Sequence, residues 1–134
     1  MEDEVIPILR VGDVAEALSW YQRLGFAQEW EHRFEAGFPA FVSIAREGMR
    51  LFLSEHTGDA RPDTLVYLRV RDVDEFAAKL GRPVEERPWA REVHVRDPDG
   101  NRLRIARRSV RRPTRHNAAY AQATCSCRVF RRAG

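Results

Sequence analysis

The chain has 134 residues, of which 43% are hydrophobic and 32% charged, and this composition is typical of one globular domain rather than of a disordered segment. No apolar stretch reaches the roughly 18 to 20 residues of a membrane helix, and residues 1–4 are too acidic for a secretory signal, so we expect a cytoplasmic protein and no membrane partner. All 20 acidic residues lie at or before Asp99, whereas residues 107–134 carry eight arginines and no acid. The positive sign of the net charge of +3 therefore comes from the tail. We do not expect the acidic body to bind nucleic acid.

The first half of the chain predicts a strand, a helix and a β-hairpin, in that order. The strand is expected over residues 5–10. The helix is expected between Asp13 and Gly25, because aspartate is a favoured N-cap and glycine commonly ends a helix just past its last apolar residue. Two apolar runs, residues 41–45 and 49–53, are separated by Arg-Glu-Gly and predict the hairpin.

The second half repeats this order. Residues 70–75 share the pattern Val-x-Asp-Val-x-Glu with residues 11–16, which lie 59 positions earlier. A strand over residues 64–70 precedes the helix, and a hairpin over residues 92–105 turns at Asp-Pro-Asp-Gly-Asn, which is strong turn chemistry. The sequence therefore predicts an α+β fold of two βαβββ modules whose mixed sheet curves around a cleft. We interpret the two aspartates of the turn as structural rather than catalytic.

We divide the chain at residue 106. Residues 1–106 are expected to form the domain, with modules over about 4–56 and 63–106. Residues 107–134 form a basic tail that we predict to be disordered, because it contains few large apolar residues. Both cysteines lie in this tail, at Cys125 and Cys127, without the second pair that a zinc motif needs.

Several short motifs accompany the duplicated pattern. The most specific is Pro-Trp-Ala-Arg-Glu at residues 88–92, which continues into Arg-Asp-Pro-Asp-Gly-Asn at 96–101. Ile-Pro-Ile-Leu at 6–9, Arg-Leu-Gly-Phe at 23–26 and Leu-Phe-Leu-Ser at 51–54 add to it. Together these motifs resemble those of the vicinal oxygen chelate superfamily. This superfamily includes glyoxalase I, extradiol dioxygenases and the fosfomycin- and bleomycin-resistance proteins. Over residues 5–106 the chain is most similar to the bleomycin-binding proteins, which implies the glyoxalase/bleomycin resistance fold.

The enzymes of this superfamily act through one divalent metal held by His and Glu side chains. Matching the motifs by position puts four residues that cannot bind such a metal where relatives have ligands: Ile6, Phe52, Leu65 and Arg104. We therefore expect no metal, no other cofactor and no catalytic residue. The alternative is a metal-dependent lyase or dioxygenase of the same superfamily with an atypical site built from His32, Glu92 or His94.

The resemblance also implies a homodimer that can exchange its N-terminal strand and that binds a flat, cationic drug between aromatic rings. Trp30 and Trp89 lie near the stacking positions of the relatives. Strand alternation turns Tyr67 and His94 toward the cleft. The side chains that we expect to contact the ligand are Trp30, Phe38, Phe52, Tyr67, Trp89, Arg91 and His94.

One feature of this cleft does not suit a cationic drug. The same alternation lines it with arginines, which favour an anionic or carbonyl-bearing ligand: Arg69, Arg96, Arg102 and Arg104. Our main hypothesis is a metal-free protein that binds a bleomycin-like antibiotic and confers resistance by sequestration. An enzyme of the superfamily remains the alternative, and binding of nucleic acid or a partner by the basic tail is a third hypothesis.

Overall fold

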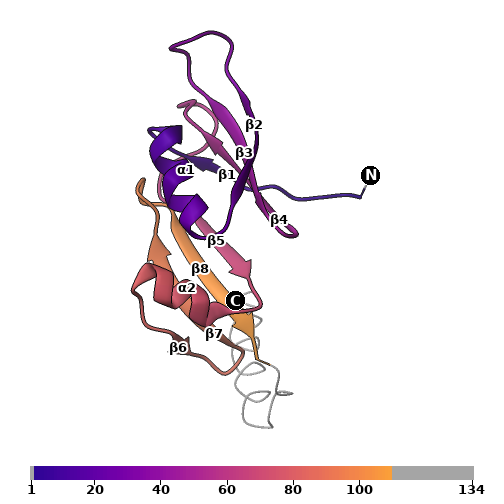
Figure 1. Ribbon diagram of the computed structural model, residues 1–134, viewed down its shortest axis with the longest axis vertical. Coiled ribbons are helices and arrows are strands. Elements are labelled where there is room, and N and C mark those ends of the chain that lie inside the picture. The colour runs from indigo at the N-terminus through magenta and orange to yellow at the C-terminus, as the bar shows by residue number, and fades with distance from the viewer. Residues whose placement is uncertain (1, 110–134) are drawn as a thin grey trace, which may run out of the picture.

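The computed structural model describes residues 2–109, which form two modules of one helix and four strands each (Figure 1). The first module contains β1 (Ile8–Arg10), α1 (Val14–Arg23), β2 (Ala27–His32), β3 (Phe41–Arg46) and β4 (Met49–Ser54). The second contains β5 (Leu65–Arg69), α2 (Val73–Leu80), β6 (Glu85–Glu86), β7 (Ala90–Arg96) and β8 (Arg102–Arg108). This order confirms the predicted α+β fold of two βαβββ modules. Within residues 2–109, neither helix has the length and apolarity needed to cross a membrane.

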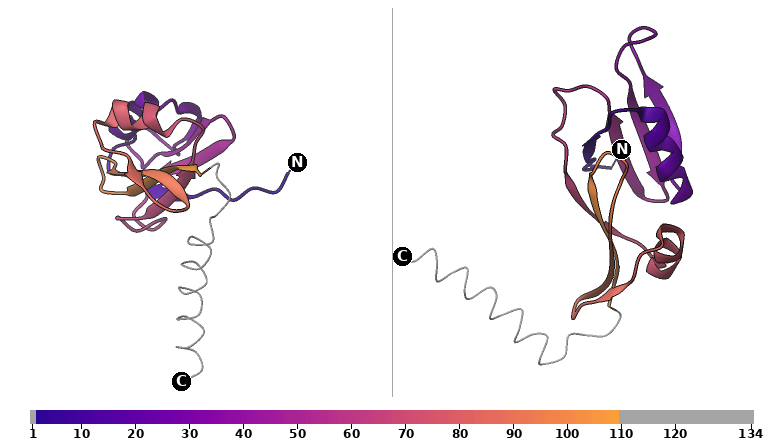
Figure 2. Two further views of the ribbon diagram at one scale, coloured as in Figure 1. Left: turned by 90° about the horizontal axis from the view of Figure 1, so that it is seen from below. Right: turned by 90° about the vertical axis from the view of Figure 1, so that its left-hand side faces the viewer.

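Each module has its own four-stranded sheet, and the two sheets have the same topology. The strand orders are β1-β4-β3-β2 and β5-β8-β7-β6. In each sheet the first strand pairs in parallel with the last strand of the module, and the other neighbours are antiparallel. The helices lie on the same side of the molecule (Figure 2, right), so both sheets turn their second face to the opposite side.

The first helix begins and ends where the sequence predicts, and an aspartate caps the start of both helices. The Asp13 carboxylate accepts a hydrogen bond from the Ala15 amide at 2.9 Å, and Asp72 accepts one from the Glu75 amide at 3.1 Å. Gly25 follows α1 with a φ of 93°, in the left-handed region that favours glycine. A side chain there would also place its Cβ 2.7 Å from Arg46 Nε, so the flexible Arg46 side chain would have to shift.

The hydrophobic core lies between the helices and the first face of each sheet, and it is continuous through both modules. In β5 the alternation is regular, because Val66 and Leu68 are buried while Leu65, Tyr67 and Arg69 are exposed. This confirms the predicted orientation of that strand. Buried side chains contributed by other elements include Leu9, Val42, Ile44, Leu53, Phe76, Leu103 and Ile105.

The Asp-Pro-Asp-Gly-Asn turn joins the second module to the first. Asn101 is buried, and its Nδ2 donates to the carbonyl of Arg10 at 2.9 Å and to Asp97 Oδ2 at 3.0 Å. Asp99 accepts a hydrogen bond from the Gly12 amide at 2.7 Å. The structural interpretation of both aspartates is therefore confirmed.

Two predicted strand ends are wrong by three residues. The first strand is Ile8–Arg10 rather than residues 5–10, because Pro7 has no amide hydrogen and contributes only its carbonyl, which accepts from the Phe52 amide at 2.9 Å. β8 ends at Arg108, three residues past the predicted end of the hairpin at residue 105, because Arg107 and Arg108 pair with Arg91 and Ala90. The predicted disorder of the tail and its cysteine pair concern residues outside the described range.

Candidate functional site

The register of the second sheet arranges its outer face, opposite α2, in rows. Directly paired residues of neighbouring strands point to the same face of a sheet. The three rows across β5, β8 and β7 are Leu65–Arg102–Arg96, Tyr67–Arg104–His94 and Arg69–Ala106–Glu92. This face therefore combines guanidinium groups, one imidazole, one carboxylate and an aromatic ring.

Glu92 is the centre of this face. Its side chain is fully buried, and its carboxylate accepts hydrogen bonds from Arg104 at 2.7 Å, Trp89 Nε1 at 3.1 Å and the Tyr67 hydroxyl at 3.2 Å. His94 Nε2 lies 3.0 Å from the same carboxylate. Burial alone raises the pKa of Glu92, but the hydrogen bonds from Arg104, His94 and Trp89 outweigh it and lower the pKa to about 2. Glu92 is therefore a charged structural anchor at neutral pH and is poorly suited to act as an acid or base.

The two aromatic side chains bound to Glu92 are anchored by their polar atoms. Trp89 remains 49% exposed and Tyr67 42% exposed. The guanidinium of Arg104 lies 5.6 Å from the centre of the Tyr67 ring. Burial and the charge of Glu92 raise the pKa of Tyr67, so its hydroxyl stays protonated and keeps donating to Glu92. The face thus presents two oriented, half-exposed rings.

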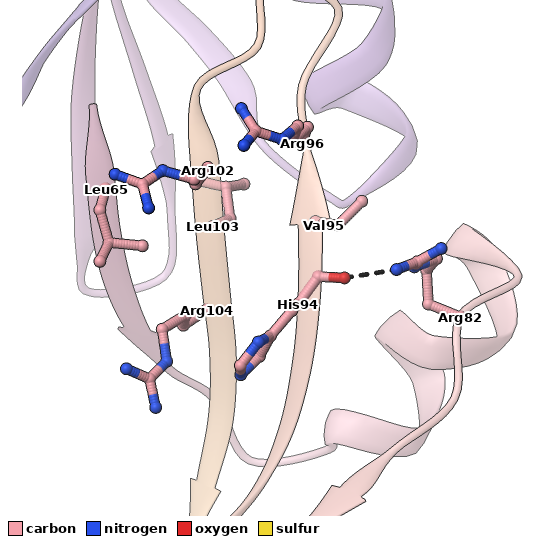
Figure 3. A pocket seen from close by; sticks show the side chains of 8 residues that line it. All are labelled: Leu65, Arg82, His94, Val95, Arg96, Arg102, Leu103 and Arg104. Carbon is pink, nitrogen blue, oxygen red and sulfur yellow. Dashed lines mark hydrogen bonds between the residues drawn. The ribbon is translucent and has the colours of Figure 1, made fainter. Parts of the chain in front are cut away.

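A cavity of about 600 Å³ opens beside this cluster (Figure 3). In the close-up, Arg102 and Arg104 extend from β8, and Arg96 comes from the neighbouring β7. Arg82, at the edge of the sheet, donates a hydrogen bond to the His94 carbonyl at 3.2 Å. The residues that line the cavity are Leu65, Arg82, His94, Val95, Arg96, Arg102, Leu103 and Arg104. Three of the four arginines expected in the cleft are therefore gathered here.

The outer face of the first sheet carries a separate aromatic cluster. The Trp30 ring stacks on Phe41 at 5.9 Å with an interplanar angle of 15°, and it lies 5.4 Å from Phe52. Trp30 is 44% exposed, so the cluster presents an apolar surface. Phe41 is not among the predicted ligand-contacting residues. It lies two positions before Ser43, which pairs with both Trp30 and Phe52, so strand alternation is the signal that places it on this face.

The structure divides the seven predicted ligand-contacting residues into groups. Trp30 and Phe52 meet on the first sheet, whereas Tyr67, Trp89 and His94 meet around Glu92 on the second. Arg91 lies apart from both, because its guanidinium binds Asp74 of α2 and Glu86 of β6, each at 2.9 Å. Phe38 is half-exposed in the segment before β3, and its carbonyl accepts a hydrogen bond from Arg33.

The donor set does not fit the divalent metal of the superfamily. Phe52 and Leu65 offer no ligand atom, and Arg104 holds the Glu92 carboxylate that a cation would need. Within residues 2–109, no three His, Cys, Asp or Glu side chains gather in an arrangement that could hold a metal ion. His32, named for the atypical site, lies on β2 of the other sheet, 5.0 Å from the ring of Phe34.

Comparison with known proteins agrees with this architecture. Residues 1–111 match the family model described as glyoxalase superfamily protein, while no curated protein matches the chain. One similar solved structure is the bleomycin resistance determinant encoded on transposon Tn5, with 23% identity, coverage of 81% of this chain and 100% of that chain, and a TM-score of 0.66. A bleomycin-binding protein complexed with bleomycin has 23% identity, the same coverage and a TM-score of 0.64.

A third similar structure is TnmS3, an antibiotic-binding protein from Streptomyces sp. CB03234, with 22% identity, coverage of 81% of this chain and 98% of that chain, and a TM-score of 0.69. At these identities the solved structures establish a shared fold. The family model covers most of the sequence and shows the family itself. The chain therefore belongs to the glyoxalase superfamily.

Proposed function

We propose that the protein binds a small planar antibiotic of the bleomycin type without a metal and confers resistance by sequestering it. The observation that carries this proposal is the pair Trp89 and Tyr67, whose polar atoms are held by buried Glu92 while about half of each side chain stays exposed. Rings fixed in this way can stack on a flat ligand with little further loss of side-chain freedom. The similar solved structures of a bleomycin-binding protein and an antibiotic-binding protein support the ligand class.

Sequestration needs no bond-making group, and this agrees with the state of Glu92. Its pKa of about 2 and its hydrogen bonds leave it without a proton to give at neutral pH. The alternative, a metal-dependent lyase or dioxygenase, would use Glu92 and His94 as ligands. A cation there would have to displace Arg104, which lies 2.7 Å from the carboxylate.

We also propose that the protein acts as a homodimer. The aromatic cluster of the first sheet and the Glu92 face of the second sheet belong to different modules, and both outer faces point away from the helices. Pairing two chains would bring the aromatic face of one against the Glu92 face of the other and enclose a flat ligand between them. The exchange of the N-terminal strand, implied by the resemblance at Pro7, is part of this proposal.

A tryptophan-fluorescence titration tests the binding. Metal-free bleomycin is added to protein treated with EDTA, and we expect saturable quenching with one ligand per chain. Trp89→Ala should abolish the saturable change. Trp20→Phe is the matched control, because Trp20 lies in α1, packed against the core and 4.8 Å from the ring of Tyr21.

The remaining outcomes separate the hypotheses. The absence of any change up to high micromolar bleomycin would refute the bleomycin assignment. A divalent metal that purifies with the protein at about one ion per chain would favour the metal-dependent enzyme instead.

A further inference from the structure

We propose that the arginine cavity of the second module binds an oxyanion, such as a carboxylate, sulfonate or phosphate group, carried by a planar ligand. Among flat molecules, this cavity would then favour those that carry an acidic group, and a cationic part of a larger ligand would have to lie outside it. The stacking of the ligand's flat body rests on the proposed function. The binding of its acidic group by the arginines rests on separate contacts, which are given below.

Asp63 shows how these arginines take a carboxylate. Its Oδ1 lies 3.0 Å from Arg96 Nη1 and 3.0 Å from Arg102 Nε, so guanidinium groups from two neighbouring strands converge on one oxygen atom. All three side chains are substantially exposed, and exposed ion pairs add little to stability. An incoming oxyanion can therefore replace Asp63 on this pair without disturbing the fold.

The cavity also contains hydrogen-bond donors that lack acceptors. Arg102 Nε and Arg104 Nε are buried atoms without a hydrogen bond within the described residues, since the contact of Arg102 Nε with Asp63 is not aligned for one. Arg82 makes no ion pair with any carboxylate of residues 2–109. An oxyanion in the cavity would supply Arg82 with an acidic partner, whereas the two Nε atoms are shielded and would reach it only after their side chains shift.

The strand register puts the arginine pair next to the surface for stacking. Leu65 shares a row with Arg102 and Arg96, and Tyr67 stands in the following row of the same face. Leu65 and Tyr67 are both about half-exposed. A ligand whose flat body covers these two side chains would therefore place an acidic substituent against Arg102 and Arg96.

The carboxylates around the cavity do not cancel this preference, because each is already engaged. Asp63 is shared by two arginines, and Glu92 is bound by Arg104. Glu85 Oε2 lies 3.4 Å from His94 Nδ1 and 3.6 Å from Arg87. A cationic group entering the cavity would be repelled by the guanidinium groups. It would find no carboxylate among these three that is without an arginine or histidine partner.

A pair of fluorescent probes with one aromatic body tests the inference. 1-Anilinonaphthalene-8-sulfonate carries a sulfonate, and N-phenyl-1-naphthylamine does not. We expect the sulfonate probe to bind at least about tenfold more tightly, since hydrogen bonds to a charged acceptor commonly change affinity by that factor or more. Arg96→Gln and Arg102→Gln should each reduce the affinity for the sulfonate probe about tenfold and leave the neutral probe unchanged.

Two further variants control for charge and for folding. Arg71→Gln removes the same charge from a separate arginine-rich hollow that also contains Arg46, Arg69, Arg107 and Arg108, and it should change neither probe. Asp63→Asn should increase the affinity for the sulfonate probe, because it frees Arg96 and Arg102. Asparagine adopts the φ of 65° at this position as readily as aspartate, so the variant should fold.

The outcomes separate this inference from the proposed function. Equal affinity for the two probes, binding of neither, or an equal loss in Arg71→Gln and Arg102→Gln would overturn the anion site. Selectivity for the sulfonate probe together with no binding of metal-free bleomycin would support the anion site and refute the bleomycin assignment. Quenching by bleomycin together with equal binding of both probes would support the bleomycin assignment and refute the anion site.

Discussion

Tyr21 in α1 donates its hydroxyl hydrogen to Asp97 Oδ2 over 2.8 Å, across 76 positions of sequence. Both side chains are buried, and Asp97 belongs to the turn of the second module while Tyr21 belongs to the helix of the first. Burial and the charge of Asp97 raise the pKa of Tyr21, so the hydroxyl stays a donor at every physiological pH. This hydrogen bond therefore ties the two modules together.

Replacing Tyr21 by phenylalanine should destabilise the fold by about 1 to 3 kcal/mol, because it leaves a buried carboxylate without one of its donors. Tyr67→Phe removes a longer hydrogen bond, 3.2 Å, from a half-exposed ring and should have a smaller effect. Urea unfolding of both variants measures the difference. Equal stability of Tyr21→Phe and the unaltered protein would contradict this role.

The turn that carries this contact could be predicted from the sequence, and so could both helices, because caps and turns depend on local chemistry. β2 and β6 could not be placed individually, since only two or three strands could be expected after each helix. Every residue of β2 is exposed, so it shows no alternation of apolar and polar side chains. β6 has two residues, and it is held by pairing with β7 rather than by burial.

The site shows a similar division. Alternation places His94 and Glu92 on one face from sequence alone, and the structure agrees. Trp89 and Tyr67 both donate to Glu92. The Trp89 side chain does so by folding back from the residue before β7, and no local sequence pattern predicts this orientation. The engagement of Arg91 depends on where α2 places Asp74, and this is a tertiary relationship as well.

Acid should remove the contribution of Glu92 to stability. Its pKa is about 2 in the fold, below its ordinary value of 4.5, so its charged form is favoured by folding. A group with a lowered pKa stabilises the fold above its unfolded pKa, and this contribution is lost as the pH falls from about 4.5 to about 2. In Glu92→Gln, the free energy of unfolding should therefore decrease less over this interval. Parallel curves for the variant and the unaltered protein would exclude Glu92 as the titrating group.

The ion pair of Arg104 and Glu92 should be strongly coupled. Arg104→Gln alone leaves a fully buried carboxylate without its shortest hydrogen bond and should destabilise the protein by roughly 3 kcal/mol. Glu92→Gln in the same chain should restore part of this loss, because no buried charge then remains. A double-mutant cycle measured by urea unfolding gives the coupling energy, and strictly additive losses would show that the two groups act independently.

Mixing two inactive variants should restore binding if the ligand lies between two chains. Trp30→Ala damages the aromatic face of the first sheet, and Trp89→Ala damages the Glu92 face of the second. In a mixed dimer, one of the two sites combines both damaged faces and the other combines two intact ones. Because half of the dimers in an equimolar mixture are mixed, about a quarter of the binding capacity for metal-free bleomycin should return after the chains are allowed to exchange. A site contained within one chain would recover nothing, and light scattering on the same samples reports whether dimers of the 15.5 kDa chain are present.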